Sequence, residues 1–299
     1  MSSRNAFEIS SDLTLVSIVM NCYNGDKYLR EAIDSIYAQS FDNWEIIFWD
    51  NGSTDNSASI AKSYDERLKY FFVENTTPLG EARSLALKEA KGDYVSFLDC
   101  DDVYLPDKIS IQLNEMQSKN ALLSYGGWIK INEEGEEIKK YELAAEFNNK
   151  FEELYVNYVV NFQTLMIENN YLKENNINFD EKLKFSVDHN LVLRIAYNIP
   201  VMSIDRLLVK YRFHEKSLSK NRNADKYEDL EYTIRFFESI GAREKYKNFQ
   251  YISSKSLIFS HLRDSFYDNN FKEVLLNLLS YLDLLVKEFL KKFNMSNNY

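Results

Sequence analysis

The chain has 299 residues, which suits one large domain or two small ones, and it is rich in Tyr and Phe but poor in Gly and Pro. Its formal net charge of -10 argues against a nucleic-acid-binding surface, so nucleic acid is not expected as a partner. The two cysteines show neither zinc-type spacing nor a disulfide framework, and no stretch reaches the roughly eighteen apolar residues of a membrane-spanning helix. We therefore expect a cytoplasmic protein with reduced thiols.

The N-terminal third alternates between predicted strands and helices. A strand at 15–20 leads into polar residues and then into a helix whose apolar residues recur at helical spacing. Further strands are predicted at 45–49, 69–73 and 94–98, with helices between them. This β–α–β–α order predicts an α/β fold with a Rossmann-like, mostly parallel sheet and helices on both faces. No G-x-G-x-x-G motif follows the first strand, which disfavours a dinucleotide site.

Three carboxylates, Asp99, Asp101 and Asp102, directly follow the strand at 94–98. Buried strands of open α/β sheets present ligands at their carboxyl ends, and crowded carboxylates repel one another unless a cation lies among them. Oxygen ligands of this kind suit Mg²⁺ or Mn²⁺. Asp99 and Asp101 are two residues apart, so on an extended segment they point the same way. The alternative is a solvated turn before the helix that Pro106 begins.

Four segments, in this order and spacing, resemble the nucleotide-sugar-binding half of family 2 glycosyltransferases with the GT-A fold: 17–24, 50–55, 79–83 and 97–102. The family pattern reads roughly S-I-V-x-P-x-Y-N, D-D-G-S-T-D, G-x-x-x-A-R-N and F-L-D-x-D-D. This chain departs from the pattern at three positions, with Asn21 in place of Pro, Asn51 in place of the second Asp and Ser84 in place of Asn.

The resemblance implies a set of nucleotide-sugar-binding residues in the first half of the chain: Cys22, Tyr23, Asn24, Asp50, Arg83, Asp99 and Cys100. In this set Asp50 would accept hydrogen bonds from the base and Asp99 would contact the ribose. Arg83 would reach the nucleotide or the diphosphate as a fixed cation.

Each of these residues also has a purely structural alternative. Tyr23 could only pack, and Asp50 could only cap the next helix. Arg83 could pair with Glu81 or Glu89.

The second half is predicted to supply the acceptor side. Strands are expected at 121–125 and 162–167, with a hairpin formed by 128–131 and 138–141. Residues 186–194 then resemble the family's E-D-x-x-L-x-x-R segment, with Val187 in the usual Glu position. The resemblance implies that Asp188, near a helix start, is the general base, and the alternative is an ordinary N-cap aspartate.

Residues 208–219 resemble the family's Y-R-x-H-x-x-S-x-S segment. By this resemblance His214 would help Asp101 hold Mn²⁺ or Mg²⁺ with the donor diphosphate, since imidazole is a suitable ligand for Mn²⁺. The alternative for His214 is a solvated loop residue. His189 and His261 have no partner pattern and are expected to be structural or surface residues.

Long helices without strand signals are predicted beyond residue 220, at 227–240, 245–263 and 271–293. We therefore expect a glycosyltransferase domain over 1–220, with a nucleotide-sugar-binding half at 14–105 and an acceptor half at 106–220, followed by a helical region at 221–299. The wide apolar face of the last helix is expected to pack on the catalytic domain or on a second copy in a homodimer. The alternative is docking on a membrane surface.

The sequence thus predicts a metal-dependent, inverting glycosyltransferase that uses a nucleotide-sugar donor, a UDP-sugar by our interpretation, in polysaccharide biosynthesis. The acceptor would be a hydroxyl of a glycan or of a lipid-linked saccharide, at the inner face of the membrane if the helices dock there. Two alternatives stay open. One is a sugar-nucleotide-binding module without catalysis, and the other is a nucleotidyltransferase, although 21–27 lacks the Gly-rich, basic loop that such enzymes usually need.

Overall fold

The computed structural model describes residues 14–148, 150–215, 217, 225–267, 276 and 278–284, with side chains left out at 225, 226 and 259–267. The chain forms two compact units. The first comprises Met1–Asn148, Val160–Lys182 and Ile199–Glu215, and the second comprises Asn149–Val159, Leu183–Asn198 and Lys216–Tyr299. The predicted division at residue 220 concerns functional domains and stays a prediction.

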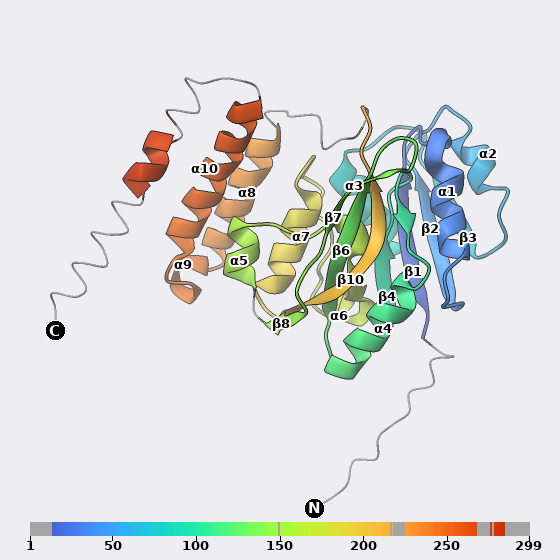
Figure 1. Cartoon of the computed structure of the whole chain (residues 1–299), viewed down its shortest axis with the longest axis horizontal. Coiled ribbons are helices and arrows are strands. Elements are labelled where there is room, and N and C mark those ends of the chain that lie inside the picture. The colour runs from blue at the N-terminus through green and yellow to red at the C-terminus, as the bar shows by residue number, and fades with distance from the viewer. Residues whose placement is uncertain are drawn as a thin grey trace, which may run out of the picture. The chain divides into compact units, whose positions relative to one another are not determined.

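The first unit is built on a ten-stranded sheet whose first four strands in the order β3-β2-β1-β4 are parallel. These strands are β1 (Val16–Cys22), β2 (Trp44–Asp50), β3 (Leu68–Phe72) and β4 (Tyr94–Phe97), and the helices that connect them are α1 (Asp26–Tyr37), α2 (Ser57–Ala61) and α3 (Leu79–Lys88) (Figure 1). The predicted mostly parallel α/β sheet is therefore confirmed.

Helices cover both faces of this sheet. Val16, Ile18 and Met20 of β1 point to one face, because alternate residues of a strand point the same way. There they pack in one core cluster with the apolar residues of α1 and of α4 (Lys108–Lys119). Helix α3 contacts β1 and β2, and the intervening residue Val19 is buried on its side of the sheet.

The remaining strands extend the sheet in the order β4-β9-β6-β10-β5, with β7 and β8 paired beside this path. They are β5 (Val103–Tyr104), β6 (Leu123–Ile131), β7 (Glu137–Tyr141), β8 (Glu146–Asn148), β9 (Met166–Glu168) and β10 (Val201–Arg212), and α6 (Asn169–Glu174) follows β9. The predicted hairpin is confirmed, because β6 and β7 pair antiparallel. The two strands expected at 121–125 and 128–131 are one continuous strand, β6. Its glycines let neighbours come close, since a Cβ at Gly126 would lie 2.4 Å from Leu208 Cδ1.

The strand predicted at 162–167 is wrong in its first half. Residues Phe162–Thr164 form a 3₁₀ turn, η2, and only Met166–Glu168 pairs as a strand. The turn forms because the Asn161 side chain accepts a hydrogen bond from the backbone N–H of Gln163, which competes with strand pairing.

The second unit is helical in its described part. It contains α5 (Phe151–Val156), α7 (Val187–Ala196), α8 (Asp225–Ser239), α9 (Ala242–Lys245) and α10 (Phe249–Tyr267). Phe151 of α5 lies among aromatic rings of the other helices, including Tyr197, Phe237 and Phe249. The predicted C-terminal helices are thus present, except that the helix expected at 271–293 lies largely outside the described residues, which are helical at 276 and 278–284.

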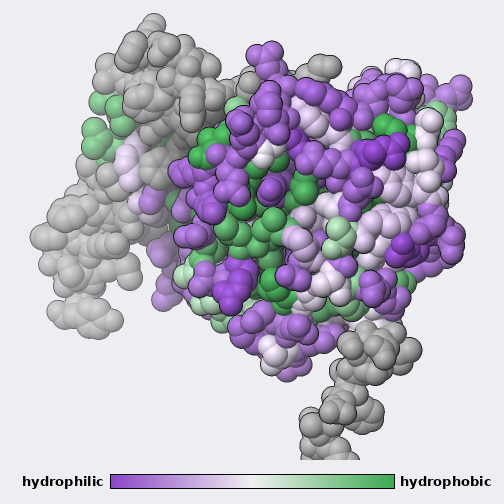
Figure 2. Space-filling view, turned by 45° about the vertical axis from the view of Figure 1, so that its right-hand side comes forward, coloured by the Kyte–Doolittle hydropathy of each residue, from purple (hydrophilic) through white to green (hydrophobic). Residues whose placement is uncertain are grey.

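Within the described residues, no helix is long and apolar enough to cross a membrane. Figure 2 shows hydrophilic side chains around a patch of hydrophobic ones in the middle of the face that it views. The predicted docking of the last helix, on a membrane or on a second copy, stays a prediction.

Candidate active site

Polar loops meet at the carboxyl edge of the parallel strands. Cys22 at the end of β1 is in register with Asp50 at the end of β2. On the other side of β1, strand β4 runs parallel to it, and the backbone N–H of Leu98 continues the pairing to Val19 O at 3.1 Å. The segments after Cys22, Asp50 and Leu98 therefore emerge side by side, as expected of ligand-binding loops in an open α/β sheet.

The loop after β1 is braced by the loop after β2. Asn24 has a φ of 53°, and its side-chain oxygen accepts a hydrogen bond from the backbone N–H of Thr54 at 2.8 Å. Its own N–H donates to Ser53 Oγ at 3.0 Å. Tyr23 is 56% exposed, so its ring does not pack in the core. A nucleotide role for Tyr23 and Asn24 stays a prediction.

Asp50 is fully buried and both of its carboxylate oxygens have partners. One accepts from the backbone N–H of Ser53 at 2.8 Å, and the other accepts from Tyr70 Oη at 2.6 Å. Burial, together with the hydrogen bond to Asp50, raises the pKa of Tyr70. Tyr70 was not among the predicted residues, because nothing in its local sequence links it to Asp50.

The departure at Asn51 has a clear structural reason. Its amide Nδ2 donates to Thr77 O at 2.9 Å, and its Oδ1 accepts from Thr77 N at 3.1 Å. An ionised aspartate accepts hydrogen bonds but donates none, so it could make only half of this pair. Asn51 therefore ties the β2 loop to the segment that precedes α3.

Arg83 pairs with Asp99 rather than with Glu81 or Glu89 in the part of the chain that the structure describes. Its Nη2 lies 3.1 Å from Asp99 Oδ1 and 3.3 Å from Asp99 Oδ2, and its guanidinium carbon lies 3.9 Å from the ring centroid of Phe162. Arg83 is 6% exposed, and its Nε is buried without a hydrogen-bond partner. The pair leaves a fixed cation and a fixed anion at the edge of the sheet.

Asp101 and His214 meet although 113 residues separate them in the sequence. His214 Nε2 lies 2.8 Å from Asp101 Oδ2. Burial, and next the charge of Asp99, raise the pKa of Asp101, while the hydrogen bond with His214 acts in the opposite direction. The His214 ring also lies 5.4 Å from the ring of Tyr28 on α1.

Asp102 turns inward and is held by Arg212. Its Oδ1 accepts from the backbone N–H of Arg212 at 2.7 Å, while its Oδ2 is buried without a partner. Burial and the charges of Asp101 and Asp99 raise the pKa of Asp102 well above its ordinary value.

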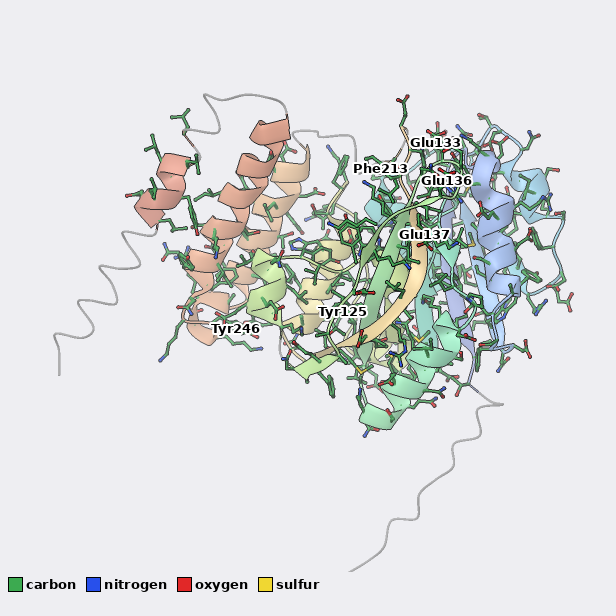
Figure 3. The ribbon with its side chains drawn as sticks, in the orientation of Figure 1. Tyr125, Glu133, Glu136, Glu137, Phe213 and Tyr246 are labelled. Atoms are coloured by element: carbon green, nitrogen blue, oxygen red, sulfur yellow. The ribbon has the colours of Figure 1, made fainter. Side chains whose placement is uncertain are left out.

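The Arg212 side chain, 2% exposed, links three segments. Its Nε donates to Asp101 O, its Nη1 donates to the backbone carbonyls of Asn132 and Glu133, and its Nη2 pairs with Glu31 at 2.6 Å. Figure 3 shows Glu133 at the same end of the sheet as Phe213, the residue that precedes His214. Arg212 thus fixes the backbone on both sides of the Asp101–His214 pair.

The thiols of Cys22 and Cys100 are hydrogen-bonded to each other beside Gly25. A Cβ at Gly25 would lie 2.5 Å from Cys100 Sγ and 3.0 Å from Cys22 Sγ, so a larger residue there would have to displace a thiol. The hydrogen bond from Cys100 lowers the pKa of Cys22, whereas that same bond and burial raise the pKa of Cys100. Both cysteines are free, and their nucleotide role stays a prediction.

The donor set at Asp101 and His214 fits a divalent cation that also binds a diphosphate. Among the described residues no group of three or more His, Cys, Asp or Glu side chains could hold a metal by itself. A carboxylate and an imidazole that already touch provide two ligands, and Mg²⁺ typically completes such a site with phosphate oxygens and water.

Asp188 lies in the second unit, one residue into α7, where Ser186 rather than Asp188 is the N-cap. Its Oδ2 accepts from Tyr158 Oη at 3.2 Å. Burial lowers the pKa of the neighbouring His189 to about 4, so this imidazole is neutral at pH 7, in keeping with a structural residue. The His261 side chain lies outside the described residues.

The start of α7 is fixed by a carboxylate that the sequence did not predict. Asp229 of α8 is buried and accepts from the backbone N–H groups of Phe185 at 2.7 Å and Ser186 at 2.8 Å, and also from that of Lys184. The C-terminal helices therefore hold the segment that carries Asp188.

The parallel half of the sheet, with braced loops and crowded carboxylates at its carboxyl edge, is typical of α/β proteins that bind ligands at this edge. Residues 17–197 match the model of the family described as Glycosyl transferase family 2. The chain therefore belongs to this family.

Similar proteins support this assignment. An uncharacterized glycosyltransferase of Rickettsia felis is 35% identical over 215 residues, which cover 69% of this chain and 35% of the relative, so this chain spans about a third of that protein's length. The Escherichia coli enzyme WfgD, a UDP-Glc:alpha-D-GlcNAc-diphosphoundecaprenol beta-1,3-glucosyltransferase, is 28% identical over 211 residues, or 70% of this chain and 81% of the relative. The crystal structure of S. aureus TarS with UDP-GlcNAc superimposes with a TM-score of 0.69 at 21% identity, over 81% of this chain and 71% of that chain.

Proposed function

We propose that this enzyme transfers a sugar from a UDP-sugar to a hydroxyl of a glycan or lipid-linked saccharide, with inversion at the anomeric carbon. The observation that carries the proposal is the convergence of Arg83, Asp99, Asp101 and His214 at one edge of the sheet. This set combines a fixed cation with carboxylates and an imidazole, which is what a metal-bound nucleoside diphosphate needs. WfgD and the TarS complex, whose names both include a UDP-linked sugar, support UDP as the nucleotide.

In this proposal each residue of the chain has a separate task. Asp50 would accept from the base in exchange for its hydrogen bond from Tyr70 Oη. Asp99 would accept from a ribose hydroxyl, and Arg83 would neutralise part of the diphosphate charge. Asp101 and His214 would hold Mn²⁺ or Mg²⁺, which when bound stabilises the leaving diphosphate. A solved mannosyltransferase from Pyrobaculum calidifontis, in complex with GDP-Man and Mn2+, supports this choice of metal and has a TM-score of 0.61.

Asp188 would act as the general base. The acceptor hydroxyl oxygen forms a bond to the anomeric carbon while the bond from that carbon to the diphosphate breaks, and the hydroxyl proton passes to Asp188. One displacement with one base gives the opposite anomer. We further propose that the enzyme works on the cytoplasmic side of a membrane when its acceptor is lipid-linked.

The metal assignment is tested by isothermal titration of UDP with and without Mn²⁺. We expect Asp101→Ala to abolish the Mn²⁺-dependent binding and His214→Ala to weaken it, because each removes one ligand. His189→Ala serves as the matched imidazole control and should keep the metal effect. Unchanged Mn²⁺ stimulation in Asp101→Ala would place the metal elsewhere.

The base assignment is tested by single-turnover transfer in Asp188→Asn, which keeps size and polarity but cannot take a proton. We expect UDP affinity close to wild type and transfer lowered by roughly 10²–10⁴-fold, the range usual for a lost general base. The released product also matters, because a glycosyltransferase releases UDP from a UDP-sugar whereas a nucleotidyltransferase releases pyrophosphate. Wild-type turnover in Asp188→Asn, or a retained anomeric configuration by NMR, contradicts this role.

A further inference from the structure

The 3₁₀ turn η2 lies directly beside the Arg83–Asp99 pair and is held firmly in place. Thr164 N donates to Asn161 O at 2.9 Å, and the Asn161 side chain accepts from Gln163 N at 3.0 Å. On the side of α4, Gln112 Nε2 donates to Thr164 O at 2.8 Å. The turn is thus tied at both of its ends.

The side-chain amide of Gln163 makes two hydrogen bonds to Asp99, one as acceptor and one as donor. Its Oε1 accepts from the backbone N–H of Asp99 at 3.1 Å, and its Nε2 donates to Asp99 Oδ2 at 2.7 Å. Gln163 is only 2% exposed, whereas the Asp99 side chain is 33% exposed. The amide therefore fixes one face of the carboxylate from inside the protein and leaves the other open to solvent.

A primary amide is well suited to this position. It carries an acceptor and a donor on one planar group, while a carboxylate has no donor and an aliphatic side chain has neither. Without Gln163, the Arg83 guanidinium would contact both Asp99 oxygens through a single nitrogen, which leaves the carboxylate free to turn. The ring of the preceding residue, Phe162, packs against the Arg83 guanidinium, whose carbon lies 3.9 Å from the ring centroid.

We propose that Gln163 is a positioning residue that orients the Asp99 carboxylate toward a ribose hydroxyl of the donor nucleotide. The inference rests on the proposed function, because it takes Asp99 as the ribose-binding residue. Gln163 itself does not touch the nucleotide. Its effect is to place the open lone pairs of Asp99 where a hydroxyl can donate to them, so that the turn η2 contributes to nucleotide recognition through Asp99.

The test compares the binding of UDP, 2′-deoxy-UDP and 3′-deoxy-UDP in the presence of Mn²⁺, by isothermal titration, in three proteins. Wild type should bind at least one deoxy nucleotide about 10–100-fold more weakly than UDP, the range for a hydrogen bond to a charged group. Gln163→Leu should bind UDP about 10–100-fold more weakly than wild type and should bind that deoxy nucleotide as weakly as UDP. Gln112→Leu, which loosens the same turn from its other side, should keep the wild-type preference for UDP.

The outcomes separate the inference from the proposed function. Suppose that wild type prefers UDP. If Gln163→Leu keeps that preference, including the case in which its affinities for UDP and for the deoxy nucleotide fall by the same factor, Gln163 does not position Asp99. If wild type binds UDP and the deoxy nucleotides equally, or does not bind UDP, the ribose role of Asp99 is wrong and the inference falls with it. Gln163→Glu covers the case in which Gln163→Leu fails to fold. It keeps the acceptor for Asp99 N but sets a second carboxylate against Asp99, and it should also lose the preference.

Discussion

Replacing Arg212 by Met should destabilise the first unit, because this side chain holds three of its segments. The side chain makes three hydrogen bonds to backbone carbonyls, those of Asp101, Asn132 and Glu133. At about 1 kcal/mol net for each bond, their loss costs about 3 kcal/mol. The pair with Glu31 adds less than about 1 kcal/mol, because the Glu31 side chain is 54% exposed and water screens it.

We therefore expect Arg212→Met to lower the free energy of unfolding by about 3–4 kcal/mol in urea titrations followed by circular dichroism. Arg206→Met is the matched control, since Arg206 lies on the same strand but is exposed and bonds only the carbonyl of Asp205 among the interactions described. It should change the free energy of unfolding by less than about 0.5 kcal/mol. A change of that small size in Arg212→Met would refute the idea that this guanidinium holds the three segments together.

Two further predictions concern buried charged groups. Burial lowers the pKa of Lys108, whose Nζ donates to Ser96 Oγ, well below the ordinary lysine value of 10.5. Between the lowered pKa and 10.5 the unfolded chain binds more protons than the folded one. The free energy of unfolding from urea titrations should therefore rise from pH 7 to pH 9 in wild type, by up to about 1.4 kcal/mol per pH unit, and should rise less in Lys108→Met. Asp229→Asn should lower the stability of the second unit by about 1–3 kcal/mol in thermal melts, because the carboxylate loses charge-assisted hydrogen bonds to the start of α7. UDP affinity in Asp229→Asn should stay at the wild-type value, because the proposed nucleotide-binding residues all lie in the first unit. The control Glu231→Gln, whose carboxylate is exposed, should keep wild-type stability. A lower UDP affinity in Asp229→Asn would contradict this prediction.

The parallel half of the sheet could be predicted from the sequence because its strands are short apolar runs, each ending at turn-forming polar residues. The run at 94–98 and the carboxylates after it follow from local pattern alone. The Asp101–His214 contact could also be anticipated, although only through the resemblance to a family, since no local signal connects residues 113 positions apart.

The residues that sequence reasoning missed all act over long distances in the chain. Gln163 lies 64 residues from Asp99, and Arg212 lies 111 residues from the Asp101 carbonyl that it binds. Asp229 is 43 residues from Ser186. An isolated Gln or Asp carries no pattern by which its partner could be found, because the partner is decided by how the strands and helices pack. Arg212 stands in the segment that resembles Y-R-x-H-x-x-S-x-S, but that segment does not name the carbonyls that its guanidinium binds.

The three carboxylates after β4, those of Asp99, Asp101 and Asp102, lie in three different electrostatic environments. Asp99 lies beside the permanently charged guanidinium of Arg83. Asp102 is buried with a pKa raised well above its ordinary value, which favours the neutral acid, and its partner is a backbone N–H rather than a guanidinium. Among the described ion pairs, the Asp101 carboxylate pairs only with His214, an imidazole that is charged only when protonated. A divalent cation at Asp101 would therefore neutralise a carboxylate whose described partner is an imidazole rather than a permanent positive charge.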